Sequence, residues 1–143
     1  MASGMSDPLY TTEILRLAAS LDDPPPLERE DGRAELVSRT CGSRVTLTVQ
    51  LDDKRRVQRL SMQVQACAFG QASAALLAKH SRGKTHDEIS EAMLALSHWL
   101  AEDHEQPGWP GIAALGPART RRARHPAILL PFRALLAAME DAR

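Results

Sequence analysis

The chain has 143 residues, a length that suits one domain built around a single hydrophobic core. Lysine plus arginine equal aspartate plus glutamate at 18 each, so no net charge attracts the protein to nucleic acid or to a membrane surface. No apolar stretch approaches a membrane span and no secretory signal opens the chain, so we expect a cytoplasmic protein with reduced cysteines. We expect residues 1–8 to form a flexible N-terminus and residues 9–143 to form one domain.

The first half of the chain predicts one helix followed by a sheet. Residues 12–19 carry apolar side chains at helical spacing and end before a run of prolines, which cannot continue a helix. A weak strand is predicted around residues 34–38. Two runs that alternate apolar and polar residues, 45–51 and 60–66, then predict a hairpin that turns at residues 52–54. These segments together predict a three-stranded antiparallel sheet.

The second half predicts helices. Residues 71–79 are rich in alanine and leucine and form a predicted helix. Thr85 and Glu88 have the spacing of a capping box, in which a hydroxyl and a carboxylate satisfy backbone N–H groups at a helix start. The helix behind this box is expected to bury four residues at helical spacing, namely Ile89, Met93, Leu96 and Leu100.

A last helix is predicted from about Ala127 to Glu140. Pro131 is expected in its first turn, where no N–H is needed, which would move the start to near Leu130. The whole pattern predicts an α+β fold in which a three-stranded antiparallel sheet packs against four to five helices.

Cys41 and Cys67 are the only thiols of the chain. The predicted hairpin returns the end of its second strand beside the start of its first, so both cysteines are expected at one rim of the sheet. Cys67 lies on the face opposite the apolar residues of its strand and next to a helix start, whose N–H groups favour a thiolate. Cys41 precedes Gly42, a residue suited to tight backbone turns. A lone cysteine usually fills a core, but this pair indicates a metal or sulfur-handling site.

Four segments carry a family resemblance: Cys41-Gly42, Ala66-Cys67-Ala68, the small-residue helix that follows, and Arg82-Gly83-Lys84-Thr85. They resemble the iron–sulfur cluster assembly scaffold family (IscU-like, SufU-like and the NifU N-terminal domain) over residues 9–140. The resemblance implies an IscU/SufE-like fold. It also implies a site at one exposed edge, where three cysteines and an aspartate or histidine hold a nascent [2Fe–2S] cluster.

By this resemblance, Cys41 and Cys67 match the first two family cysteines, and His125 matches the histidine that precedes the third. The chain has Ser43 where the family has an aspartate, and Pro126 where it has the third cysteine. The predicted metal ligands are Cys41, Cys67 and His125, and the predicted supporting residues are Ser43, Arg124 and Lys84. The cargo would be iron or a [2Fe–2S] cluster, with zinc as the alternative in the isolated protein. A fourth ligand has to come from water, a small thiol, a partner or a second copy in a homodimer.

Three functions remain open. The leading one is a scaffold-like protein that binds iron or a labile [2Fe–2S] cluster and passes it to apo-proteins, with a cysteine desulfurase supplying sulfur. In the second, Cys67 accepts persulfide sulfur and activates the desulfurase, while Cys41 resolves the persulfide or is idle. The third is a degenerate regulatory paralogue that docks to the desulfurase without a cluster. We expect no conventional enzyme, because the sequence has no recognisable set of nucleophile, base and orienting group.

Overall fold

The computed structural model describes residues 10–22, 26–101 and 105–142. In chain order, its elements are α1 (Thr12–Ala19), β1 (Gly32–Val37), β2 (Arg44–Leu51), β3 (Val57–Gln65), α2 (Ala68–His80), α3 (His86–Leu100), two 3₁₀ segments η2 (Ile112–Thr120) and η3 (Arg122–Arg124), and α4 (His125–Asp141). The N-terminus predicted to be flexible, residues 1–8, lies outside the described residues.

The sheet is antiparallel and has the strand order β1-β2-β3, as predicted. Its register pairs Val37 with Arg44 across the first hairpin and Arg44 with Gln65 across the second. Side chains alternate between the two faces, and β2 therefore sends a fully buried row into the core, formed by Val45, Leu47 and Val49.

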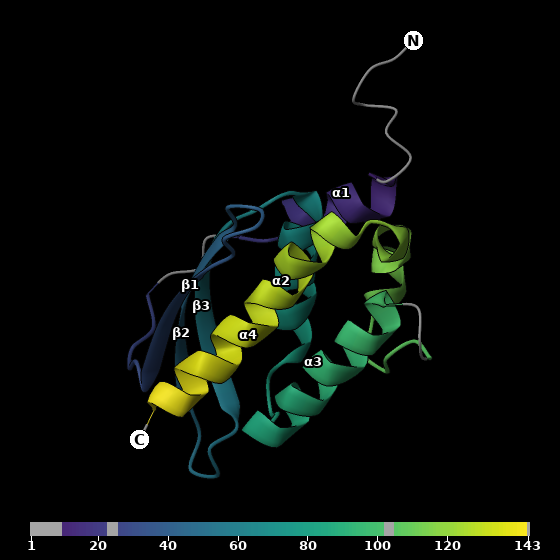
Figure 1. Ribbon diagram of the computed structural model, residues 1–143. Helices are drawn as coiled ribbons and strands as arrows, with labels where there is room; N and C mark the ends of the chain where they lie inside the picture. The colour runs from purple at the N-terminus through teal and green to yellow at the C-terminus, as the bar shows by residue number, and fades with distance from the viewer. Residues whose placement is uncertain (1–9, 23–25, 102–104, 143) are drawn as a thin grey trace.

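The helices cover one face of this sheet (Figure 1). α4 crosses β1 and β2, α2 packs beside it, and α3 lies on the far side of α4. α1 packs on α2 at the end of the molecule where α4 begins. Within the part of the chain that is described, no helix has both the length and the hydrophobicity needed to cross a lipid bilayer.

The first turns of α2 approach α4 closely. A Cβ placed on Gly70 would lie 3.2 Å from the carbonyl oxygen of Ala127. One turn further along, the fully buried Ser73 donates a hydrogen bond from Oγ to the carbonyl oxygen of Ile128 at 2.6 Å. These contacts fix the start of α2 relative to the start of α4.

The predicted capping box is confirmed at the start of α3. Thr85 Oγ1 accepts a hydrogen bond from the backbone N–H of Glu88 at 3.2 Å, and Glu88 Oε1 accepts one from the N–H of Thr85 at 2.9 Å. Local chemistry therefore sets this helix start, which explains why the sequence alone could locate it.

The prediction for the last helix was wrong at its start. α4 begins at His125, so Pro131 lies inside the helix and not in its first turn. A proline inside a helix removes the hydrogen bond to the carbonyl four residues earlier, here that of Ala127. The helix persists because its packing outweighs this loss: Pro131 and Phe132 are both buried, as are most residues around them.

Candidate functional site

Cys41 lies in the turn that joins β1 to β2. The backbone N–H of Ser38 donates to the carbonyl oxygen of Ser43, and the N–H of Gly42 donates to that of Ser38, each at 2.8 Å. Gly42 has φ 73°, in the left-handed region that a glycine adopts without a Cβ clash. This turn presents the Cys41 side chain to solvent.

Two hydroxyl groups contact the thiol of Cys41. The thiol donates to Ser38 Oγ at 3.2 Å, and its sulfur lies 3.1 Å from Ser43 Oγ. Partial burial opposes ionisation of the thiol. Once the sulfur is ionised, the hydroxyls of Ser38 and Ser43 donate to it, as do the backbone N–H groups of Ser43 and Cys41. These hydrogen bonds outweigh the burial and lower the pKa of Cys41 below its usual value. A lowered pKa increases the fraction of nucleophilic, metal-binding thiolate near neutral pH.

Cys67 is the N-cap residue of α2. Its backbone is extended (φ −65°, ψ 172°), and its carbonyl oxygen accepts from the N–H of Gln71 at 3.0 Å. The side chain makes no capping hydrogen bond, is half-buried, and packs against the edge of the hydrophobic core. The N-terminus of a helix favours negative charge, so the position suits a thiolate.

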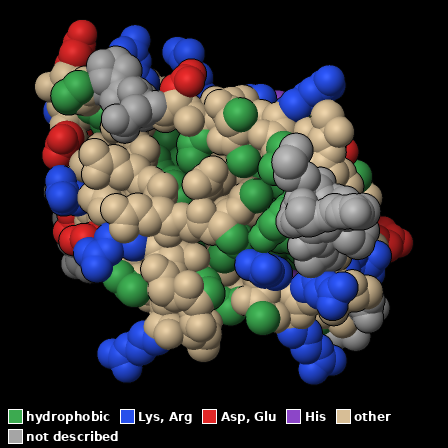
Figure 2. Space-filling view, turned by 90° about the horizontal axis from the view of Figure 1, so that it is seen from above, with side chains coloured by type: hydrophobic (Ala, Val, Ile, Leu, Met, Phe, Trp, Pro, Cys, Tyr) green, Lys and Arg blue, Asp and Glu red, His purple; other side chains and the backbone are tan. Residues whose placement is uncertain are grey.

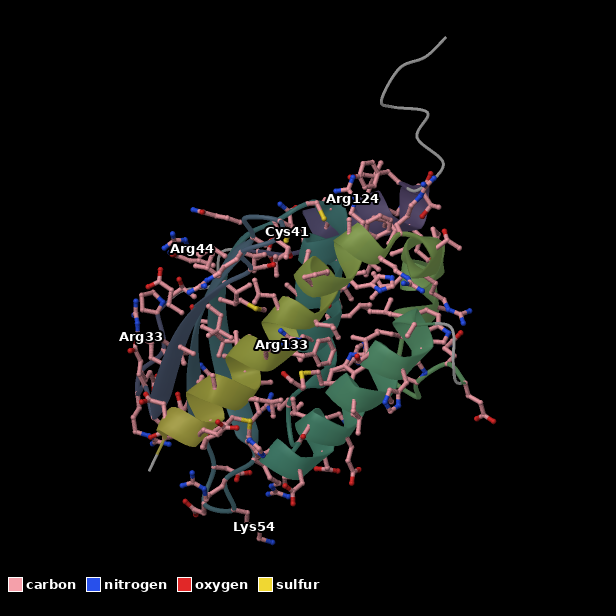
Figure 3. The ribbon with its side chains drawn as sticks, in the orientation of Figure 1. Arg33, Cys41, Arg44, Lys54, Arg124 and Arg133 are labelled. Atoms are coloured by element: carbon pink, nitrogen blue, oxygen red, sulfur yellow. The ribbon has the colours of Figure 1, made fainter. Side chains whose placement is uncertain are left out.

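The register places both cysteines beyond the same end of the sheet. Arg44, the first residue of β2, pairs with Gln65, the last residue of β3, and this pair marks one end of the sheet. Cys41 comes three residues before Arg44, and Cys67 comes two residues after Gln65. In Figure 3, Cys41 lies at the end of the sheet opposite Lys54, which belongs to the turn of the second hairpin. The two thiols thus share one rim of the molecule.

His125 is the first residue of α4. Its Nε2 lies 2.9 Å from the carbonyl oxygen of Ala118, and because a carbonyl can only accept, Nε2 carries the proton. In the neutral ring, Nδ1 then keeps the lone pair that a metal ion would need. His125 is half-buried.

Arg124 lies at the same end of the molecule as Cys41 (Figure 3). Its guanidinium carbon is 6.0 Å from the ring centroid of Tyr10, and that ring is 5.5 Å from the ring of Phe69 in α2. Figure 2 looks onto the end that carries α1, where exposed hydrophobic side chains lie near the centre and both basic and acidic side chains lie around the margin.

The structure does not bring Lys84 to the cysteines. The carbonyl oxygen of Lys84 accepts from the N–H of Val57 at 2.9 Å, and Val57 begins β3 at the end away from Gln65. The ammonium group lies 5.4 Å from the ring centroid of Trp109. Lys84 therefore packs at the other end of the strand, although the sequence motif that contains it resembles the family.

Across the described ranges, no three His, Cys, Asp or Glu side chains are placed so that they could hold a metal ion. The structure therefore does not assemble Cys41, Cys67 and His125 into a three-ligand site. Sequence reasoning also missed Ser38, which contacts the Cys41 thiol as closely as Ser43 does. The sequence feature that could have indicated this contact is the presence of a serine on each side of Cys41, at Ser38 and Ser43.

Comparisons with known proteins identify the family of the chain. The family model of the NifU-like N terminal domain matches residues 9–99, more than half of the chain, and the protein belongs to this family. No curated protein matches the chain significantly.

Solved structures extend the likeness over nearly the full length. A NifU-like protein (N-terminal) from Brucella abortus, described as nitrogen-fixing, is 31% identical, with a TM-score of 0.86 and 94% of each chain covered. A putative iron–sulfur cluster assembly scaffold protein for the SUF system from Fervidobacterium islandicum AW-1 is 22% identical, with a TM-score of 0.82 over 96% of this chain and 99% of that one. A hypothetical protein is 20% identical, with a TM-score of 0.71 over 92% and 97%. The predicted α+β fold of the NifU-like scaffold class is thereby confirmed.

Proposed function

We propose that this protein is a scaffold-like component of iron–sulfur cluster assembly. It holds iron or a labile [2Fe–2S] cluster through Cys41 and Cys67 and passes this cargo to apo-proteins. The observation that carries the proposal is the placement of both thiols beyond one end of the sheet, one of them in a turn whose hydroxyls stabilise a thiolate. A cysteine desulfurase would supply the sulfur, and a reducing cytoplasm would keep both thiols free.

The donor set fits a transient site better than a storage site. A [2Fe–2S] cluster usually takes four protein ligands, and this chain offers two thiolates. Nδ1 of His125 could add a nitrogen donor only after a local rearrangement, because no group of three ligands exists among the described side chains. The remaining ligands would come from a small thiol, a partner protein or a second copy of the chain. Because this chain supplies fewer ligands to the cluster, it should hold the cluster more weakly and pass it on more easily.

Each residue has a separate task in this proposal. The hydroxyls of Ser38 and Ser43 stabilise negative charge on the exposed Cys41, which meets the incoming cargo first. Cys67, half-buried at the start of α2, supplies the second thiolate from a rigid element. Ser43, which stands where the family has an aspartate, stabilises the thiolate and is not itself a ligand.

A second candidate function is sulfur acceptance at Cys41, in place of Cys67, which was the acceptor expected from the sequence. The exposed thiol and the lowered pKa of Cys41 favour it. In this reaction the Cys41 thiolate attacks the outer sulfur of the desulfurase persulfide. A new S–S bond forms on Cys41 as the S–S bond of the desulfurase breaks, and the desulfurase cysteine leaves as a thiolate.

Anaerobic reconstitution with ferrous iron, a cysteine desulfurase and cysteine tests the proposal. Visible absorption and acid-labile sulfide should appear with the native chain and be lost in both Cys41→Ala and Cys67→Ala. Persulfide on Cys41 without a cluster, retained in Cys67→Ala, would replace the scaffold function with sulfur acceptance. Desulfurase binding that survives the loss of both thiols, with neither cluster nor persulfide, would indicate a regulatory paralogue.

The same assay tests His125 against a matched histidine. If His125 joins the cluster, His125→Ala should lower cluster retention, while His80→Ala at the end of α2 should not. Equal retention in the two variants would remove His125 from the site.

A further inference from the structure

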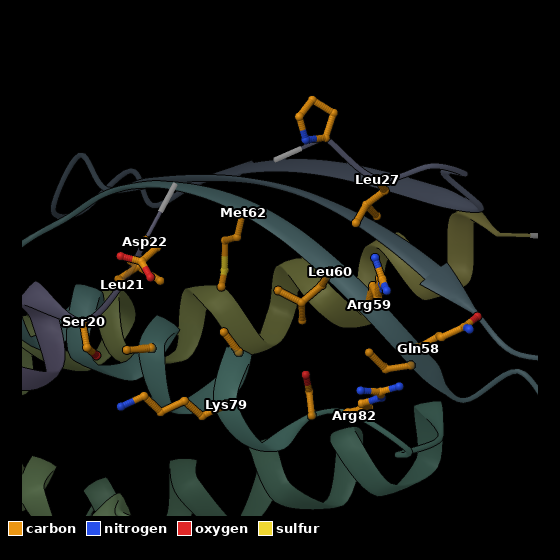
Figure 4. Close-up of a pocket in the computed structure, with 15 residues that line it drawn as sticks. Ser20, Leu21, Asp22, Leu27, Gln58, Arg59, Leu60, Met62, Lys79 and Arg82 are labelled. Atoms are coloured by element: carbon orange, nitrogen blue, oxygen red, sulfur yellow. The ribbon is translucent and has the colours of Figure 1, made fainter. Parts of the chain in front are cut away.

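A pocket opens between β3, α2 and the described residues 20–22 and 26–27, which follow α1 (Figure 4). Its volume of about 490 Å³ falls within the range of about 300–1,000 Å³ that is typical of small-molecule sites. Apolar side chains from all three segments dominate its lining, among them Leu21, Leu27, Val57, Leu60, Met62 and Ala78. The described residues that line it include neither cysteine nor His125, so the pocket is separate from the candidate cluster site.

The charged side chains around this pocket are mostly cationic. Arg59 comes from β3, Lys79 from α2 and Arg82 from the turn after α2. Among the described residues that line the pocket, Asp22 is the one carboxylate. As far as the chain is described, none of the three cations forms an ion pair. In Figure 4, Arg59 and Arg82 lie at the end of the pocket beside Gln58, and Lys79 lies toward the other end.

Backbone hydrogen bonds hold the two arginine-bearing segments together. The N–H of Gly83 donates to the carbonyl oxygen of Val57 at 2.8 Å, and the N–H of Val57 donates to that of Lys84 at 2.9 Å. Gly83 has φ 86°, so the turn that carries Arg82 depends on a glycine at this position. These bonds fasten the turn to the start of β3, where Arg59 lies. The cationic end of the pocket is therefore built on fixed backbone.

We propose that this pocket binds a small amphipathic carboxylate, such as a medium-chain fatty acid. The apolar body lies between β3 and α2, where its hydrocarbon surface is removed from water. The carboxylate lies between Arg59 and Arg82, because guanidinium groups bind carboxylates through paired, charge-assisted hydrogen bonds. An amphipathic cation of the same length is repelled by the two arginines and does not bind there.

The test is a titration of the full chain, labelled with ¹⁵N, with decanoate and with decyltrimethylammonium as the charge-reversed probe. Decanoate should shift the amide signals of Leu60, Met62 and Ala78 in a saturable way, and decyltrimethylammonium should not. The double variant Arg59→Glu/Arg82→Glu should weaken decanoate binding at least tenfold. The control Arg121→Glu/Arg122→Glu makes the same change in net charge at two exposed arginines that do not line the pocket, and it should bind as the native chain does.

A second variant tests occupancy without changing charge. Ala78 is exposed on α2 and lines the pocket, so Ala78→Phe should fold and should block decanoate by filling the space. Equal binding of the two probes, equal loss in both charge variants, or shifts confined to another surface would overturn the proposal. The protein could instead sediment with phosphatidylglycerol vesicles, and decanoate could fail to release it. That result would assign these arginines to a membrane surface and would also overturn the proposal.

Discussion

Gly70→Ala should destabilise the protein although alanine is the better helix former. A Cβ at Gly70 would lie 2.7 Å from Cβ of Ala66, and 3.2 Å and 3.3 Å from the carbonyl oxygen and Cβ of Ala127. None of these atoms is the end of a flexible side chain, so α2 has to move away from α4 and from the end of β3. Overpacking of this kind costs about 1–3 kcal/mol. The gain from replacing a helical glycine is about 0.5–1 kcal/mol, so the middle of the two ranges leaves a net loss of roughly 1 kcal/mol.

Thermal and urea unfolding measure this loss. For a chain of this length, each kcal/mol lowers Tm by about 2–4 °C, so Gly70→Ala should melt about 2–4 °C below the native chain. Gly116→Ala is the matched control, because a Cβ there meets nothing within 4 Å and the backbone has no positive φ, so it should be neutral or slightly stabilising. A Gly70→Ala variant as stable as the Gly116→Ala control would refute the close approach of α2 and α4 that positions the candidate site.

Three further predictions concern charge and ligands. Ser43→Ala removes a hydrogen bond to the Cys41 thiolate, so the pKa of Cys41 should rise. The measurement is the pH profile of iodoacetamide alkylation in a variant that keeps only this thiol, and the profile should move to higher pH. The hydrogen bond from Arg29 is the main cause of the lowered pKa of Asp31, so this carboxylate stabilises the fold at neutral pH and loses its effect as pH falls through its lowered pKa. Asp31→Asn should therefore be less stable than the native chain in urea at neutral pH, and the difference should shrink in acid; a difference independent of pH would contradict this. Pro126→Cys supplies a third thiolate at the start of α4 and should increase cluster occupancy after reconstitution, whereas no gain would count against the match to the family's third cysteine.

The parts of the fold that local chemistry decides were predictable from the sequence. Alternation located the sheet, and the spacing of Thr85 and Glu88 located the start of α3. The start of α4 was not predictable in this way. The local rule that prolines avoid helix interiors placed Pro131 in the first turn, but in the structure the burial of the surrounding helix overrides that rule.

The candidate site was predictable in part. Strand register follows from alternation, and it puts Cys41 and Cys67 beyond the same sheet end. The hydroxyl contact from Ser38 depends on how the turn closes, and the position of Lys84 depends on a long-range backbone bond to Val57. Neither feature leaves a periodic signal. For the same reason, the meeting of Arg59 and Arg82 at one pocket could not be inferred from their distance in the sequence.

The central claim is that Cys41 and Cys67 work as one site, and a thiol-bridging reagent tests it most directly. Dibromobimane becomes strongly fluorescent when it joins two neighbouring thiols, and it requires neither metal nor partner. We predict strong fluorescence and a single intramolecular cross-link in the reduced native chain, and loss of both in Cys41→Ala and in Cys67→Ala. Separate, unbridged modification of the two thiols in the folded native chain would contradict a shared site.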